Sequence, residues 1–167
     1  FTLYPCCEKD YYELWQGYFD LERDYGGIQA ELSRDSVLKT AISYGSGIRI
    51  LKQDPWETLI SFIISANNNI PRIKGIVERL CQEFGEEIIL DDKTYYSFPD
   101  AKTLSVLSLE QLSVIRAGFR DKYILDAAIK VANGDLLLSK LSDTNAAHAR
   151  LELMRIKGVG EKVANCI

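Results

Sequence analysis

The segment LMRIKGVGEKVANCI, residues 153–167, decides the fold that this sequence predicts. Its pattern indicates a helix that ends near Arg155, a hairpin centred on Gly158-Val159-Gly160, and a second helix that begins at Glu161. Two glycines one residue apart allow the chain to reverse tightly. The start of a helix leaves backbone N–H groups unpaired and carries the positive end of the helix dipole. Together these features predict a phosphate site that reads no base sequence.

Lys162 lies one residue inside the second helix, beside the predicted phosphate site. A lysine must lose its proton before it can attack carbon, and solvated lysines are almost wholly protonated at pH 7. The helix dipole and partial burial disfavour the ammonium form, and proteins use both to activate a lysine for Schiff-base chemistry. An ordinary solvated lysine is the competing interpretation, so the position of Lys162 is what makes it the candidate nucleophile.

The composition predicts one substantial core and excludes several classes of site. The chain has 167 residues, of which 47% are hydrophobic, and no apolar run approaches the length of a membrane span. The single histidine, His148, leaves little room for a catalytic triad or a histidine-based metal site. The four cysteines match no zinc-binding spacing, so we expect reduced thiols.

The net charge of −4 weighs mildly against a nucleic-acid partner, because phosphate binding usually leaves a basic footprint. A small cationic face can nevertheless lie within an acidic total. The predicted hairpin would bind phosphate through backbone groups, so it does not depend on an excess of lysine and arginine.

The apolar periodicity predicts a mainly α fold. Asp35, Asp54, Asp100 and Ser108 are candidate N-caps, and Pro55 suits the first helical position. Residues 91–99 are predicted to form a loop. The expected helical ranges are 9–19, 28–32, 36–44, 56–65, 70–84, 101–107, 109–116, 122–133 and 143–155, with a short piece ending near 141.

The domain organisation is expected to be incomplete. Residues 1–5 alternate apolar and polar side chains like the end of a strand, and a lone strand needs partners. We therefore predict that residues 1–8 end an N-terminal sheet domain that is mostly missing. Residues 9–167 are predicted to form a helical domain that is cut inside the second helix of the helix-hairpin-helix. Because the sequence opens on Phe1 rather than Met, we expect a fragment or a processed product.

Several motifs, in order along the chain, carry a resemblance to a known family. They are Gln53-Asp54-Pro55, Ser61-Phe62-Ile63, Asn67-Asn68-Asn69-Ile70-Pro71-Arg72, residues 77–81, residues 91–95, Phe98-Pro99, Ala117-Gly118-Phe119-Arg120 with Tyr123, and residues 158–166. In these motifs the chain resembles the 8-oxoguanine DNA glycosylases of the helix-hairpin-helix superfamily of base-excision enzymes. The triple-Asn motif is far more specific than the hairpin, and the resemblance covers nearly the whole chain.

The resemblance implies a bifunctional DNA repair enzyme, both a glycosidase and a lyase. Lys162 would attack the sugar C1′ of the damaged nucleoside, expel the base and form a Schiff base that permits β-elimination. The base must first leave the duplex, because stacking shields C1′. Cys166 would line the pocket for the flipped base. No cofactor would be required for catalysis.

The resemblance also assigns roles in DNA binding. Asn67 would fill the space left in the duplex, Arg72 and Arg120 would donate to the opposite cytosine, and Phe119 would act as a wedge. The hairpin residues have backbone roles: the N–H groups of Gly158, Gly160 and Val163 would bind a phosphate, and the carbonyls of Met154, Ile156 and Val159 can hold a structural cation.

Each of these residues also has a plainer interpretation. The three asparagines could simply end a helix, because asparagine tolerates left-handed backbone. Arg72 and Arg120 could be solvated, and Cys166 could be a small core residue. Two departures from the family pattern also matter. Lys157 stands where family members commonly have proline, and the Pro-Val-Asp motif that carries the family's catalytic aspartate is not in this sequence.

The sequence therefore predicts the core of an enzyme that excises 8-oxoguanine opposite cytosine and cleaves the resulting abasic site. Its partner would be double-stranded DNA with an oxidised guanine, bound by a monomer with no membrane association. We expect it in the bacterial cytoplasm with the nucleoid, or in a eukaryotic nucleus. Two alternatives stay open: an endonuclease III-like glycosylase for oxidised pyrimidines, and a helix-hairpin-helix module that binds DNA without chemistry.

Overall fold

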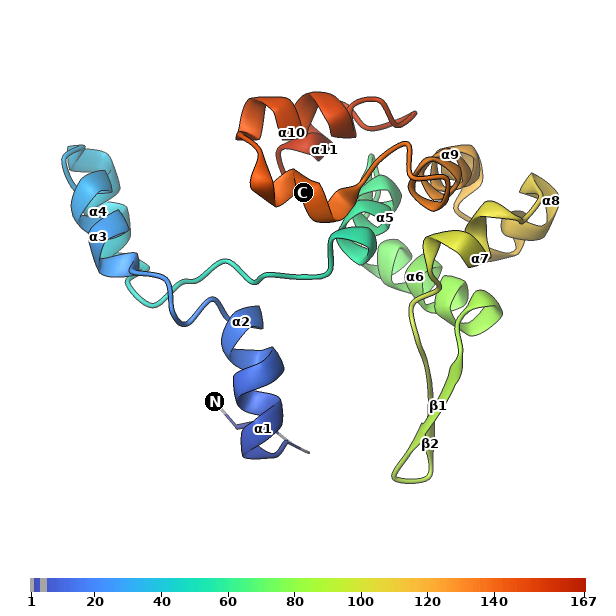
Figure 1. Cartoon of the computed structure of the whole chain (residues 1–167), viewed down its shortest axis with the longest axis horizontal. Coiled ribbons are helices and arrows are strands. Elements are labelled where there is room, and N and C mark those ends of the chain that lie inside the picture. The colour runs from blue at the N-terminus through green and yellow to red at the C-terminus, as the bar shows by residue number, and fades with distance from the viewer. Residues whose placement is uncertain (1, 4–5) are drawn as a thin grey trace. The chain divides into compact units, whose positions relative to one another are not determined.

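The computed structural model describes residues 2–3 and 6–167, which form two compact units, Phe1–Gln53 and Asp54–Ile167 (Figure 1). Helices dominate both units, so the predicted mainly α fold is confirmed. No helix in the described part of the chain has the length and apolar character needed to cross a bilayer.

The first unit consists of short helices and contains one buried carboxylate, that of Asp20. Its helices are α1 (Glu8–Asp10), the π-helical turn η1 (Tyr11–Trp15), α2 (Gln16–Tyr18), α3 (Tyr25–Leu32) and α4 (Ser36–Tyr44). Asp20 follows α2 in left-handed backbone and is 4% exposed. Its carboxylate lies 2.6 Å from the Arg23 guanidinium and 2.9 Å from the Lys52 ammonium, and it accepts a hydrogen bond from the Tyr25 hydroxyl. These contacts tie α2 and α3 to the end of the unit.

The second unit surrounds α5 (Pro55–Ser65), whose Leu59, Ile60, Ile63 and Ile64 are fully buried. As predicted, Asp54 caps this helix by accepting the N–H groups of the first turn. Around α5 lie α6 (Ile70–Phe84), α7 (Ala101–Ser105) and α9 (Asp121–Ala132), all of which contribute buried side chains to one core.

A β-hairpin replaces part of the predicted loop at residues 91–99. Strands β1 (Glu87–Leu90) and β2 (Lys93–Tyr96) pair antiparallel, with Leu90 opposite Lys93. Asp91 and Asp92 form the two-residue turn, with φ angles of 49° and 57°. Positive φ at both central residues is the geometry of a type I′ turn, which matches the twist of the strands that it joins.

The rest of the second unit is made of short helical pieces. They are α8 (Leu109–Leu112), η2 (Ser113–Ile115), η3 (Gly118–Arg120), η4 (Leu138–Asp143), α10 (Ala146–Leu153) and α11 (Glu161–Ala164). The helix predicted for residues 143–155 begins later, at Ala146, because Asn145 provides the N-cap and η4 extends to Asp143.

The predicted N-terminal strand falls largely on residues that are not described. Phe1, Tyr4 and Pro5 lie outside the described residues, while Thr2 and Leu3 belong to no helix or strand. The predicted domain boundary after residue 8 concerns a longer protein and stays a prediction. In the structure Glu8 begins α1, and the compact units divide at residues 53 and 54.

The hairpin between α10 and α11 depends on Gly158. Its φ is +83°, and a Cβ atom added there would lie 2.4 Å from the Tyr123 ring. We predict that Gly158→Ala lowers the free energy of unfolding of the second unit by about 2–4 kcal/mol, through left-handed strain and overpacking. Urea unfolding followed by Trp56 fluorescence in a Trp15→Phe background would measure the change.

Gly160→Ala is the matched control, because its φ is −95° and an added Cβ would meet nothing within 4 Å. Its cost should stay below about 1 kcal/mol, the loss expected for alanine at an N-cap. Equal costs for the two variants would contradict the role assigned to Gly158.

Asp20 should make the first unit sensitive to acid. The hydrogen bond from Lys52, with that from Tyr25 and the positive charges of Arg23 and Lys52, outweighs burial and holds the pKa of Asp20 below its ordinary value. This stabilisation is therefore present above the unfolded pKa of about 3.9 and is lost as the pH falls through the folded pKa. We predict that Asp20→Asn lowers the melting temperature at pH 7, and that its deficit shrinks below about pH 3.9.

The measurement is thermal unfolding followed by Trp15 fluorescence in a Trp56→Phe background. Glu22→Gln removes an exposed carboxylate from the same segment and should behave like the parent at both pH values. A deficit for Asp20→Asn that is unchanged at low pH would show that the charge of Asp20 is not what stabilises the unit.

Candidate nucleic-acid interface and active site

The helix-hairpin-helix predicted at residues 153–167 is present as α10, the hairpin and α11. Leu153, Ile156 and Val159 are buried in the core of the second unit and anchor the hairpin to it. The N–H group of Val159 donates to the carbonyl of Ile156 at 3.1 Å, which closes the turn. Gly160 is the N-cap of α11, so the loop delivers the chain directly to a helix start.

Lys162 lies in the first turn of α11, as the sequence predicts, but its side chain is exposed. The partial burial expected for Lys162 is therefore wrong for this structure, because α11 turns Ala164 towards the core and leaves Lys162 on the outer side. Within residues 2–3 and 6–167, Lys162 forms no ion pair, so its amine is open to a ligand. Cys166 is also exposed rather than part of the core.

The triple-Asn loop connects α5 to α6, and its members have different tasks. Asn67 adopts left-handed backbone with a φ of 48°, which reverses the chain after α5. The Asn68 amide donates to the Ile64 carbonyl at 3.0 Å and closes the end of that helix. The Asn69 side chain accepts the Arg72 N–H and caps α6. Asn68 and Asn69 thus stabilise helix ends, whereas the Asn67 side chain is exposed at the bend between the two helices.

Arg120 is buried directly beneath this loop, with 2% of its surface exposed. Its guanidinium donates to the carbonyl of Ala66 through Nε at 3.0 Å and also through Nη2. It donates further to the carbonyls of Asn67 at 2.9 Å and Ala117 at 3.1 Å. Burial, together with the like charge of Arg72, lowers the pKa of Arg120. The structure therefore brings Asn67, Arg72 and Arg120 together, and it uses Arg120 to hold the loop.

Phe119 forms an exposed aromatic tip beside these groups, with 53% of its surface accessible. The Arg120 Cζ lies 4.4 Å from the centre of its ring, and the Tyr123 ring packs edge-on at a centroid distance of 5.9 Å. Tyr123 also touches the hairpin at Gly158. A chain of contacts therefore runs from the triple-Asn loop through Arg120, Phe119 and Tyr123 to the helix-hairpin-helix.

Tyr123 is a residue whose role the sequence analysis missed. It matched a family motif, but no function was attached to it. The four-residue spacing from Phe119 to Tyr123 is a usable signal, because residues four apart share one face of a helix. The contact with Gly158, 35 positions along the chain, has no local signal.

The predicted backbone cation site stays a prediction. The carbonyl of Ile156 already accepts the Val159 N–H, although a carbonyl oxygen has a second lone pair. Among the described residues, no group of three or more His, Cys, Asp or Glu side chains could hold a metal ion.

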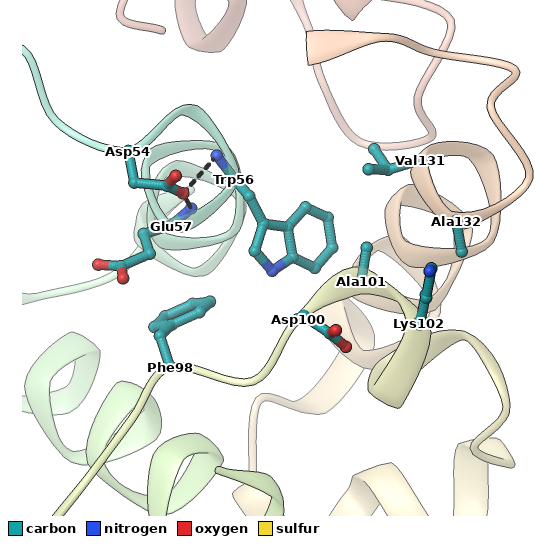
Figure 2. A pocket seen from close by; sticks show the side chains of 9 residues that line it. All are labelled: Asp54, Trp56, Glu57, Phe98, Asp100, Ala101, Lys102, Val131 and Ala132. Carbon is teal, nitrogen blue, oxygen red and sulfur yellow. Dashed lines mark hydrogen bonds between the residues drawn. The ribbon is translucent and has the colours of Figure 1, made fainter. Parts of the chain in front are cut away.

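A separate cavity of about 470 Å³ lies between α5, α7 and α9 (Figure 2). The Trp56 indole and the Phe98 ring line it, and the indole N–H donates to the Pro99 carbonyl at 2.9 Å. Three carboxylates also line it, those of Asp54, Glu57 and Asp100, with one lysine, Lys102. Burial and the neighbouring Asp54 raise the pKa of Glu57. The cavity contains none of the predicted site residues, and its acidic rim is unsuited to phosphate.

The chain is similar to several known proteins. The family model described as 8-oxoguanine DNA glycosylase, N-terminal domain, matches residues 2–59. The N-glycosylase/DNA lyase of Saccharomyces cerevisiae is 42% identical over 133 residues, which are 72% of this chain and 35% of the yeast protein.

Two solved structures are similar over 96% of this chain. MBOgg1 in complex with a low-affinity DNA ligand has a TM-score of 0.87 at 50% identity. The Clostridium acetobutylicum 8-oxoguanine glycosylase/lyase, in complex with double-stranded DNA containing cytosine opposite 8-oxoguanine, has a TM-score of 0.87 at 42% identity. The chain covers 56% of each of these two chains, so it spans about half of their length. On its motifs, its helix-hairpin-helix and these matches, the chain belongs to the 8-oxoguanine DNA glycosylase family of the helix-hairpin-helix superfamily.

Proposed function

We propose that the protein to which this chain belongs is a DNA glycosylase and AP lyase that excises 8-oxoguanine opposite cytosine. One observation carries the proposal: a single compact unit holds Lys162 at the start of α11 and the Asn67, Arg72, Phe119 and Arg120 group at the adjoining surface. A non-catalytic DNA-binding module would use Lys162 only as a positive charge beside a phosphate, whereas the proposed enzyme uses its unprotonated Nζ, and the borohydride experiment below separates the two. The matched relatives favour oxidised guanine over the oxidised pyrimidines of an endonuclease III-like enzyme.

The proposed reaction starts when the damaged nucleotide leaves the duplex and exposes its C1′ atom. The unprotonated Nζ of Lys162 attacks C1′, the glycosidic C–N bond breaks, and the base leaves with the bonding electron pair and takes up a proton. The sugar ring then opens to an imine on Nζ. Loss of a C2′ proton from this Schiff base expels the 3′ phosphate and nicks the strand.

The phosphate next to the extruded nucleotide would be held by backbone N–H groups. We assign this task to Gly158, Gly160 and Val163, at the hairpin and the first turn of α11, where the helix dipole adds to the attraction. The carbonyls of Met154, Ile156 and Val159 would hold a structural cation, and no cofactor would enter the chemistry.

The opposite cytosine would be read by Arg72 and Arg120, with Asn67 filling the vacated space and Phe119 wedged into the stack. In the structure the Arg120 guanidinium is committed to three backbone carbonyls. Four of its five N–H groups are in use, so a bidentate contact from Arg120 to a cytosine would break at least one of those hydrogen bonds. Arg72 is exposed and can contact a base without such a loss.

We predict that Lys162→Gln abolishes covalent trapping by borohydride on duplex DNA with 8-oxoguanine opposite cytosine. The glutamine amide cannot form an imine, so excision by the full-length protein should fall by at least about a thousandfold. Lys157→Gln is the matched control, since Lys157 is an exposed lysine on the same hairpin and should leave trapping intact. An undiminished adduct from Lys162→Gln would refute the assignment of the nucleophile.

We predict that Arg72→Ala relaxes the choice of opposite base. A bidentate arginine contact is worth about 1–3 kcal/mol, so the ratio of excision rates opposite cytosine and opposite adenine should fall by about 5–150-fold. Single-turnover kinetics on the two duplexes would measure it. Lys74→Ala, which removes an exposed charge from the same helix, should lower both rates together. The same pattern for Arg72→Ala would mean that Arg72 contacts only the DNA backbone.

A further inference from the structure

One face of α9 lies against the hairpin. Tyr123, Asp126 and Lys130 are three and four positions apart, so they form a row along the helix. Tyr123 packs against Gly158, as described above, and the other two side chains contact the residues that precede it. This row is the candidate for setting the position of the hairpin.

Asp126 and Lys130 form a connected set of polar contacts with the hairpin backbone. The Asp126 carboxylate accepts the Lys157 N–H at 2.9 Å and the Lys130 ammonium at 2.6 Å, both on Oδ2. The same ammonium donates to the carbonyl of Arg155 at 2.7 Å. The Lys157 ammonium lies 3.6 Å from Oδ1. Thus the residues on both sides of Ile156 are bonded to α9 through this pair.

The pair is shielded from solvent, unlike most surface ion pairs. The Asp126 side chain is 13% exposed and that of Lys130 is 26% exposed. Burial alone would raise the pKa of Asp126, but the hydrogen bonds from Lys130 and from the Lys157 N–H outweigh it and hold that pKa below its ordinary value. The carboxylate is therefore charged at neutral pH, and charge-assisted hydrogen bonds of this kind are short and strong.

The negative charge of Asp126 lies beside the proposed phosphate site. A carboxylate beside a phosphate site repels the ligand, so Asp126 would weaken DNA binding if it acted through its charge alone. Backbone N–H groups bind phosphate only when they converge on one point, and that requires a fixed hairpin. The contacts of Asp126 supply such a fixed point.

We propose that Asp126 is a positioning residue for the phosphate-binding hairpin, acting through the Lys157 N–H and held in place by Lys130. The proposal rests on the proposed function, in which the hairpin binds DNA phosphate. Because α9 begins immediately after Phe119 and Arg120, the same contacts also set the spacing between the wedge and the hairpin.

The test compares Asp126→Ala and Asp126→Asn in the full-length protein. Asparagine keeps an acceptor for the Lys157 N–H but loses the ion pair, whereas alanine loses both. On duplex DNA with a tetrahydrofuran abasic analogue, we expect the dissociation constant to rise about tenfold for Asp126→Ala and less for Asp126→Asn. Asp135→Ala, which removes an exposed carboxylate from the same unit, should leave it unchanged.

Two further measurements separate positioning from charge. Hydrogen exchange of the Lys157 and Gly158 amides should accelerate in Asp126→Ala, with or without DNA. The slope of log affinity against log salt should stay as in the parent, because no phosphate contact is added. If Asp126 only offsets the charge of Lys157, its removal should instead tighten binding and steepen the slope by about 0.9.

Tighter binding by Asp126→Ala, or unchanged amide exchange, would overturn the proposal. If the parent protein binds the abasic duplex and Asp126→Ala binds it with the same dissociation constant, the role of Asp126 is overturned and the proposed function is not. A parent that neither binds this duplex nor forms a borohydride adduct would overturn the proposed function, and with it the phosphate-positioning role.

Discussion

The hydrogen bonds of the buried Arg120 guanidinium hold together the surface that we propose to face DNA. A charge removed from water must be compensated, and here the compensation comes from the carbonyls of Ala66, Asn67 and Ala117. These carbonyls belong to two loops about fifty positions apart, so one side chain fixes both. The hydrogen bond from Arg120 to the Asn67 carbonyl stabilises the left-handed backbone of Asn67. The residue that the family resemblance assigns to base reading is therefore also the one that holds the reading loop together.

Helix α9 extends this organisation to the hairpin. It begins directly after Arg120, packs the Tyr123 ring against Gly158 and holds the Lys157 N–H with Asp126. A tight hairpin alone leaves its orientation free, whereas two contacts from one rigid helix define it. The residues proposed to recognise the opposite base and those proposed to bind the phosphate are thus connected to neighbouring parts of a single helix. A shift of α9 would disturb both, which is the physical reason to treat the surface as one site.

The sequence predicted the parts of the structure that local chemistry determines. Asp35, Asp54, Asp100 and Ser108 all cap the helices expected of them, because an N-cap bonds N–H groups two or three positions away. The hairpin at residues 87–96 was missed because its turn is Asp91-Asp92, without the glycine that usually signals a type I′ turn, and because both strands are exposed on every side chain. The position of Lys162 was predicted correctly and its partial burial wrongly, because exposure depends on the packing of distant residues. The contacts of Arg120 with the Ala66 and Asn67 carbonyls were not predicted, because no signal near residue 120 indicates partners more than fifty positions away.

The acidic composition is consistent with DNA binding once the distribution of charge is considered. Three carboxylates line the cavity between α5, α7 and α9, away from the predicted site residues, while Arg72, Lys157 and Lys162 are exposed on the other elements. Phosphate capture by backbone N–H groups depends on their direction rather than on net charge. A protein that binds phosphate through the direction of its backbone N–H groups needs side chains that hold the backbone in place. Asp126 does this with a negative charge, which is compatible with the proposed phosphate site if the direction of the backbone N–H groups contributes more to binding than the charge of the lysines.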